Sequence, residues 1–479
     1  MKLVNINLRI LQKRQIDMSN KSKDKDLTQG PIVKGLIQFS APLLFGLVFQ
    51  QLYNTVDTLV VGNFIGKEAL AAVGSTSPII NTLIGIFMGF SMGANVIVSQ
   101  YYGANDEKSV QDAVHTSIIM SFFFSVIITI IGIVSAPAML RFMDTPDDVI
   151  HDASVYLEIY FSGAIGLIFY NTGSGILRAV GDSTRPLYFL VFSAIVNTVL
   201  DLVFVIVFNM GVAGVAWATV IAQVLSSILV IVVLTRTTGS YRINWKKLKL
   251  NYPMLKNIIR IGLPSSVQQG LTAFSNVFVQ GYINKFGSAF MAGYSAYGKI
   301  DAIALLPMQA TAMGCTTFVG QNIGAGKIKR AKKGIKISLI MSLTFTAVLL
   351  LPLIIFAEQA IMIFNSEPDV IYYGTLYMRF VSPFYLLSCI NQVYAGALRG
   401  AGDTRAPMVI MLGSFVVFRQ IYLYAVSNIF RNNFYPILFA YPAGWIVCSL
   451  VLYIYYRKSG WEHKQVIIKS KTEADMETD

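Results

Sequence analysis

Two aspartates lie inside long apolar stretches of the chain, where a charged side chain is costly and usually functional. Counted at about 1.5 Å per residue from the predicted outer ends of these stretches, Asp57 lies roughly 9 Å deep and Asp201 roughly 10 Å deep. Asn197 precedes Asp201 by four residues and shares its helix face. Asn54 precedes Asp57 by three residues and also shares its helix face. Thr219 of a third stretch lies at a similar depth. The sequence therefore brings two carboxylates, two amides and a hydroxyl to one level.

Two carboxylates that meet in a water-poor site cannot both stay charged without a proton, a cation or a basic partner. A proton can be shared between them, or Na⁺ can be bound by carboxylate, amide and hydroxyl oxygens, which are hard ligands. We therefore predict a cation-coupling site at Asp57, Asn197, Asp201 and Thr219, with Asp57 and Asp201 as the candidate Na⁺ ligands. The residues leave H⁺ and Na⁺ open, and no organic cofactor is predicted. The alternative is that both aspartates only cap or bridge helices.

Further polar side chains in the apolar stretches are candidates for a solute path: Gln50, Asn54, Gln268, Lys299, Asp301, Arg379 and Arg419. A local or interhelical ion pair is the alternative for Lys299 and Asp301, and a packing role is favoured for Arg379 and Arg419. Pro42 interrupts the hydrogen bonding of the helix that carries Asp57, so that helix is expected to bend or to be statically kinked.

The elements that must position these residues are membrane-spanning helices. The chain has 479 residues, of which 54% are hydrophobic and 13% charged, and this balance indicates a membrane protein. A formal charge of +13, gathered mostly in alternate connections, favours cytoplasmic loops over nucleic-acid binding. Twelve stretches are long enough to cross a bilayer as helices: 35–62, 69–97, 115–136, 153–176, 186–208, 211–234, 255–283, 289–314, 335–357, 372–395, 406–427 and 435–456.

An internal repeat organises these stretches. The segment from Ser174 to Asp182 recurs, 221 residues later, as the segment from Ala395 to Asp403, and both contain Leu-Arg-x-x-Gly-Asp. The same shift relates Gln100 to Gln321. Six spans per half place both halves the same way up, as a parallel repeat with a solute path between the lobes. The predicted division is a polar tail (1–30), an N-lobe (31–235), a linker (236–254), a C-lobe (255–457) and a second tail (458–479).

The second half lacks the acids of the first. The residues that match Asn197, Asp201 and Thr219 are Phe418, Tyr422 and Ala440, and either Phe278 or Val279 matches Asp57. This asymmetry points to an ion site confined to the N-lobe, with drift after duplication as the alternative.

Lysine and arginine mark the cytoplasmic side. They are concentrated in the first tail and in the connections after the sixth and eighth spans, which predicts a multi-pass plasma-membrane protein with both termini cytoplasmic. The three cysteines have no CxxC spacing, so neither a zinc site nor a disulfide framework is expected. Because the sequence also lacks a nucleotide-binding motif, it predicts neither an enzyme nor an ATP-driven pump.

The chain resembles the MATE (multidrug and toxic compound extrusion) transporters. The residues that carry the resemblance are Ala41-Pro42, the segment from Gln51 to Asp57, the Leu-Arg-x-x-Gly-Asp repeats and the segment from Asn197 to Asp201. The resemblance implies twelve helices in two lobes around a V-shaped cleft. It also implies antiport of organic, often cationic, compounds against protons or sodium.

The resemblance further implies roles for single residues. Asp57 matches the family's first-helix acid and Pro42 its bending proline, while Asn197, Asp201 and Thr219 match the N-lobe cation site and Tyr156 a nearby tyrosine. Some members carry acids in helices 7 and 10, where this chain has Gln268, Gln269 and Asn276 in helix 7 and no acid in helix 10. A C-lobe sodium site is therefore not expected, and the pattern is closer to the DinF-like or archaeal type, with coupling in the N-lobe.

The leading hypothesis is a cation-coupled exporter of small amphipathic or cationic organic compounds that works as a monomer among membrane lipids. The alternative within transport is a flippase for lipid-linked oligosaccharides, which a cationic cleft and additional helices would favour. A third hypothesis, a receptor or scaffold that transports nothing, explains neither the duplication nor the buried acids.

Overall fold

The regular structure consists of helices, as the sequence predicted. The structure is a computed structural model that describes residues 26–143, 145–430 and 433–463. Most of the two predicted tails, 1–25 and 464–479, lies outside the described residues. Within the described residues every regular element is helical.

The first half of the chain folds into seven α-helices that follow one another with short connections. Two of them, α5 and α6, meet at a 47° bend and together make one broken span. The seven are α2 (Ile32–Val60), α3 (Lys67–Gly103), α4 (Glu107–Phe142), α5 (Asp147–Ser162), α6 (Ala164–Ala179), α7 (Thr184–Leu202) and α8 (Gly211–Arg236).

The second half is more often broken. Its helices are α9 (Tyr252–Ile283), α10 (Ser288–Ala304), α11 (Leu306–Gly324), α12 (Ile328–Ile355), α13 (Ala357–Met362), α14 (Pro368–Val381), α15 (Tyr385–Gly400), α16 (Arg405–Leu412), α17 (Arg419–Ile429), α18 (Tyr435–Leu438) and α19 (Ala440–Lys458). Four of the predicted apolar stretches each correspond to a pair of these helices: α10–α11, α14–α15, α16–α17 and α18–α19.

Hydropathy alone finds nine membrane-crossing helices in the described residues, or ten if the α5–α6 pair counts as one span. The helix α9 and the α14–α15 pair are missing from that set. Gln268 and Gln269 of α9 and Gln392 of α15 line a cavity between the lobes, so these helices carry amides where other spans carry apolar side chains. Exposed apolar residues on other helices, such as Phe123, Ile130 and Val134 of α4, suit contact with lipid.

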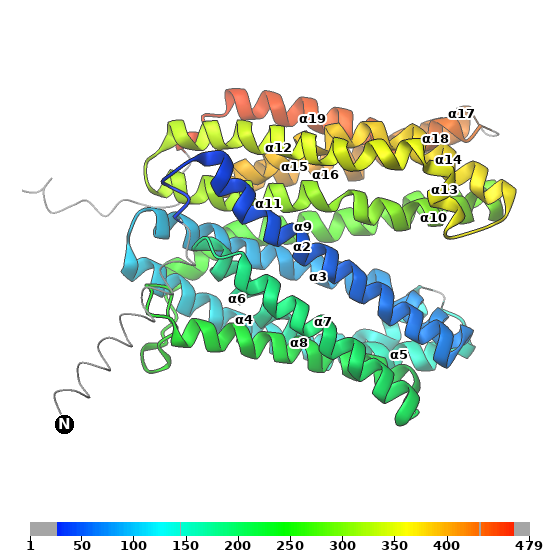
Figure 1. Cartoon of the computed structure of the whole chain (residues 1–479), viewed down its shortest axis with the longest axis horizontal. Coiled ribbons are helices and arrows are strands. Elements are labelled where there is room, and N and C mark those ends of the chain that lie inside the picture. The colour runs from blue at the N-terminus through cyan, green and yellow to red at the C-terminus, as the bar shows by residue number, and fades with distance from the viewer. Residues whose placement is uncertain (1–25, 144, 431–432, 464–479) are drawn as a thin grey trace, which may run out of the picture.

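The two halves lie side by side with their long helices aligned, as Figure 1 shows. Helices α2 to α8, coloured blue to green, form one lobe, and helices α9 to α19, green to red, form the other. The lobes meet mainly where α3 packs on α9 and where α11 packs on α2 and α3. These four helices therefore make most of the contact between the lobes.

The repeated Leu-Arg-x-x-Gly-Asp motif is a helix stop followed by a turn. In α6 the N–H of Gly181 bonds to the carbonyl of Arg178 (3.0 Å), and the N–H of Asp182 to that of Leu177 (2.9 Å). The second copy repeats both bonds at 2.9 Å from Gly402 and Asp403. This pattern is the Schellman motif, which needs a left-handed residue, and φ is +90° at Gly181 and +94° at Gly402.

We expect Gly181→Ala to lower the stability of the protein by about 1–2 kcal/mol, because a Cβ is strained in the left-handed region. Thermal unfolding of the purified protein in detergent measures this loss as a lower midpoint. Gly281→Ala is the matched control, because Gly281 is helical and a Cβ there meets nothing within 4 Å. An unchanged midpoint for Gly181→Ala would contradict the prediction.

Candidate ion and solute sites

Asp57 and Asp201 meet at the contact of α2 with α7 in the N-lobe. Asp57 is 8% exposed and Asp201 is fully buried. Their carboxyl groups lie within hydrogen-bonding reach of each other. Each aspartate precedes a π-helical turn, η1 (Val61–Ile65) or η2 (Val203–Val207), and such turns are frequent at functional sites.

No donor in the described part of the chain satisfies this pair. Oδ1 of Asp57 and both carboxylate oxygens of Asp201 are buried without a hydrogen-bond partner among the described residues. Two bare carboxylates in contact repel each other and have lost their hydration, so the arrangement requires a shared proton or a bound cation. The geometry suits either species.

Three further predicted residues gather beside the pair. Asn197 Nδ2 lies 3.5 Å from Thr219 Oγ1, and Asn197 Oδ1 has no partner among the described residues. Tyr156 of α5 is buried within hydrogen-bonding reach of Thr219. Oxygen atoms from α2, α5, α7 and α8 thus lie close to one another. Oxygen is the ligand type that a hard cation needs.

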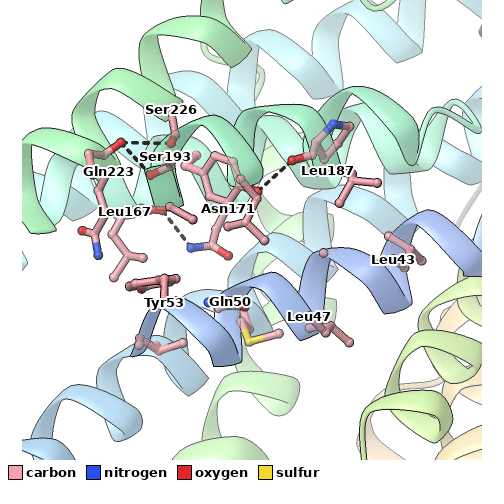
Figure 2. A pocket seen from close by; sticks show the side chains of 18 of the residues that line it. Leu43, Leu47, Gln50, Tyr53, Leu167, Asn171, Leu187, Ser193, Gln223 and Ser226 are labelled. Atoms are coloured by element: carbon pink, nitrogen blue, oxygen red, sulfur yellow. Dashed lines mark hydrogen bonds between the residues drawn. The ribbon is translucent and has the colours of Figure 1, made fainter. Parts of the chain in front are cut away.

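A cavity of about 100 Å³ opens next to this cluster inside the N-lobe. Asn197 and Thr219 form part of its wall, and Pro42 and Gln50 of α2 form another part. Figure 2 shows Gln50 and Tyr53 facing the side of the cavity that Asn171 and Gln223 line.

One expectation for this cluster is wrong. Asn54 was expected to accompany Asp57, but its side chain is exposed and does not line the cavity. The helix turns Asp57 towards α7, while Asn54, one turn earlier, points away from it.

A second cavity, of about 270 Å³, lies between the lobes. Gln268 lines it, as do two arginines that the sequence did not single out, Arg178 of α6 and Arg399 of α15. The two cavities share part of their wall, including Asn171 and Arg178. The interlobe cavity therefore adjoins the N-lobe cavity that Asn197 and Thr219 line.

The remaining candidates line neither cavity. Lys299 is exposed, with its ammonium 5.2 Å from the centre of the Phe364 ring, and Arg379 is also exposed. Asp301 accepts a hydrogen bond from the Tyr385 hydroxyl, so it does not pair with Lys299 as the sequence allowed.

Arg419 is held inside the C-lobe. Its Nη2 donates to Ser275 Oγ (2.9 Å) and to Asn276 Oδ1 (2.8 Å), and its guanidinium lies over the ring of Tyr441. This agrees with the packing role that was favoured for it.

At one end the lobes are joined by two hydrogen bonds from equivalent positions of the repeat. Gln100 of α3 donates to the carbonyl of Gly400 in the other lobe (2.9 Å), and its repeat partner Gln321 of α11 donates to the carbonyl of Ala179 (2.7 Å). Both glutamines are fully buried. The lobes are therefore closed at this end, which the orientation predicted from the sequence would place in the cytoplasm.

Comparison with known proteins identifies the family of the chain. The family model MatE matches the chain twice, over residues 42–203 and 264–425. The chain belongs to the MatE family. The two matches coincide with the two halves seen in the sequence repeat.

Relatives of this MatE protein match it over nearly their whole length. The "Probable multidrug resistance protein YpnP" of Bacillus subtilis is 29% identical over 92% of this chain and 98% of its own. The "FAD transporter" of Shewanella oneidensis is 24% identical, over 82% of this chain and 87% of its own.

A solved structure described as the outward-facing conformation of a multidrug resistance MATE family transporter superposes with a TM-score of 0.86. It is 23% identical and covers 91% of this chain and 98% of its own. The predicted fold class, an all-α membrane protein of twelve helices in two parallel repeats, is confirmed. The MatE protein is thus a multi-pass membrane transporter and not an enzyme.

Arg178 and Arg399 of this MatE protein were missed because the predicted spans ended at residues 176 and 395. The helices α6 and α15 run on to Ala179 and Gly400, which places both arginines inside the fold. The signal was present in the repeat itself, since the two arginines occupy the same position in the Leu-Arg-x-x-Gly-Asp motif.

Proposed function

We propose that the protein is a secondary active exporter of organic compounds, driven by a proton or sodium gradient through the Asp57–Asp201 pair. It would act as a monomer in the plasma membrane with both termini in the cytoplasm. One observation carries the proposal: two buried carboxyl groups lie within hydrogen-bonding reach of each other, and three of their four oxygens have no hydrogen-bond partner among the described residues. Such a pair takes up a proton or a cation because its bare state is unfavourable.

The names of the relatives support the export of organic solutes. One is called a probable multidrug resistance protein and another an FAD transporter, and the two names span unlike chemistries. The relatives therefore indicate an organic cargo without fixing its charge, so they do not test the cationic solute expected from the resemblance.

The coupling would operate through α2. Asp57 lies on this helix, and so do Pro42 and Gln50, which line the N-lobe cavity. A proton or Na⁺ bound between Asp57 and Asp201 draws α2 onto α7, and release of the cation restores the repulsion between the carboxylates. Because α2 also contacts α11 of the other lobe, a change in its shape reaches the interface between the lobes.

Transport into proteoliposomes tests the proposal, with a proton gradient and a sodium gradient imposed separately. The reporters are two fluorescent solutes of opposite charge, ethidium and FMN. We expect one gradient to drive movement of at least one solute against its concentration, and the other gradient to have no effect. Flux that equals that of protein-free vesicles for both solutes and both gradients would refute gradient-driven export.

One observation favours the flippase alternative, namely the two arginines of the interlobe cavity, because a lipid-linked oligosaccharide carries a pyrophosphate. The twelve spans, without additional helices, argue against it. Movement of headgroup-labelled lipid between leaflets, with no movement of ethidium or FMN, would make the flippase the better proposal.

A further inference from the structure

Arg178 and Arg399 are positive charges that form no ion pair with the described residues, and they line a cavity to which those residues contribute no acid. Arg399 is 5% exposed, its Nη1 donates to Gln268 Oε1 at 3.4 Å, and its Nε has no hydrogen-bond partner among the described residues. Arg178 faces both cavities, and Tyr170 rather than a carboxylate is the ionisable group that interacts with it. Arg399 is buried and Arg178 is half-buried, and because burying an unpaired guanidinium is costly, an anion in the cavity would stabilise both.

The acids nearest in the sequence are committed to other partners. Asp182 accepts hydrogen bonds from the backbone N–H groups of Thr184 and Arg185, and its carboxylate pairs with the Arg185 side chain at 3.3 Å. Asp403 accepts a hydrogen bond from the Tyr455 hydroxyl at 2.7 Å. Both acids thus serve the helix turns that follow the arginines.

The rest of the cavity wall is neutral and rich in hydrogen-bonding groups. Asn95, Asn171, Gln269, Gln309, Gln392 and Thr316 all line it, and no Asp or Glu does. Arg178 is separated from Arg399, and Asn171 from Gln392, by the same 221 residues that relate the halves. The cavity thus lies where the two lobes present equivalent residues, with one guanidinium from each lobe.

We propose that the interlobe cavity is an oxyanion-binding site and that the transported solute carries a phosphate or carboxylate group, which Arg178 and Arg399 bind from opposite lobes. Guanidinium groups suit this role because their forked N–H donors match two oxygens of a carboxylate or phosphate. The amides around them bind the neutral part of the solute. This inference rests on the proposed export function and names its substrate class.

Equilibrium binding of matched fluorescent pairs to the purified full-length protein in detergent tests the site. FMN and riboflavin differ by one phosphate, and rhodamine 110 and its methyl ester rhodamine 123 differ by one free carboxylate. We expect the member that carries the free phosphate or carboxylate, in at least one pair, to bind about tenfold or more tightly than its partner, the size expected of a charge-assisted hydrogen bond. The pair that discriminates identifies the group as phosphate or carboxylate.

Arg178→Gln and Arg399→Gln should each remove this preference, and Arg178→Lys and Arg399→Lys, which keep the charge, should retain part of it. Arg419→Gln is the matched control, because Arg419 is also buried, at 3% exposure, but lies outside the cavity. Equal affinity within both pairs in the unaltered protein would overturn the proposal, as would a preference that survives loss of both arginines. Because no gradient is used, a negative result here leaves the ion-coupling experiment standing.

Discussion

Replacing Asp57 with asparagine is expected to reduce gradient-driven export to the leak of protein-free vesicles while the protein stays folded and membrane-inserted. Asparagine has the shape of aspartic acid and can donate one hydrogen bond to Asp201, so the contact between α2 and α7 is preserved. It cannot take up and release a proton, and it no longer offers a charged ligand to Na⁺. The N-lobe is therefore fixed in a state that resembles the cation-bound one.

Flux of the solute that the unaltered protein moves in proteoliposomes measures this effect. Glu158→Gln is the control, since it neutralises a carboxylate of α5 that lines neither cavity. Asp201→Asn should match Asp57→Asn, and the double variant should be no worse than either, because two residues that act as a unit are not additive. Export by Asp57→Asn at the rate of the unaltered protein would remove this carboxylate from the coupling mechanism.

Much of the fold could be predicted because the repeat and the apolar stretches report on it directly. A shift of 221 residues that preserves Leu-Arg-x-x-Gly-Asp requires two equivalent lobes, and the structure shows why the motif is kept: Gly181 and Gly402 must adopt a left-handed φ at equivalent helix ends. Helix ends were harder to place, because the hydropathy of the sequence drops several residues before the helix ends. The backbone hydrogen bonds of α6 and α15 continue for three and five residues beyond the predicted apolar stretches.

The difference between the predicted and observed helix ends explains which site residues the sequence identified and which it missed. Asp57, Asn197, Asp201 and Thr219 stood out because they interrupt apolar stretches, and the structure brings all four together. Arg178 and Arg399 lie just outside those stretches, so the sequence did not single them out as buried charges. The position of Asn54 could not be settled by helical spacing, because the direction a helix face points depends on the neighbours it packs against.

Replacing Gly324 with valine is expected to abolish transport by preventing closure of the lobes at the predicted cytoplasmic end. A Cβ at Gly324 would lie 1.9 Å from the carbonyl oxygen of Gln100, and one at Gly103 would lie 2.0 Å from that of Gln321. The obstructing atoms are backbone, so no side chain can rotate to make room. The two lobes would have to separate there, which breaks the hydrogen bonds from Gln100 to Gly400 and from Gln321 to Ala179.

Alternating access requires each end of the cleft to close in turn, so a transporter that cannot close one end exchanges nothing against a gradient. The separation can be followed at Ser99, which is fully buried between the lobes, after Ser99→Cys and replacement of the native cysteines by serine. A thiol reagent should modify this cysteine readily with Gly324→Val and slowly without it. Gly298→Val is the control, because a Cβ at Gly298 meets no atom within 4 Å. Continued protection of the cysteine together with undiminished transport would show that close approach at Gly324 is not required for the transport cycle.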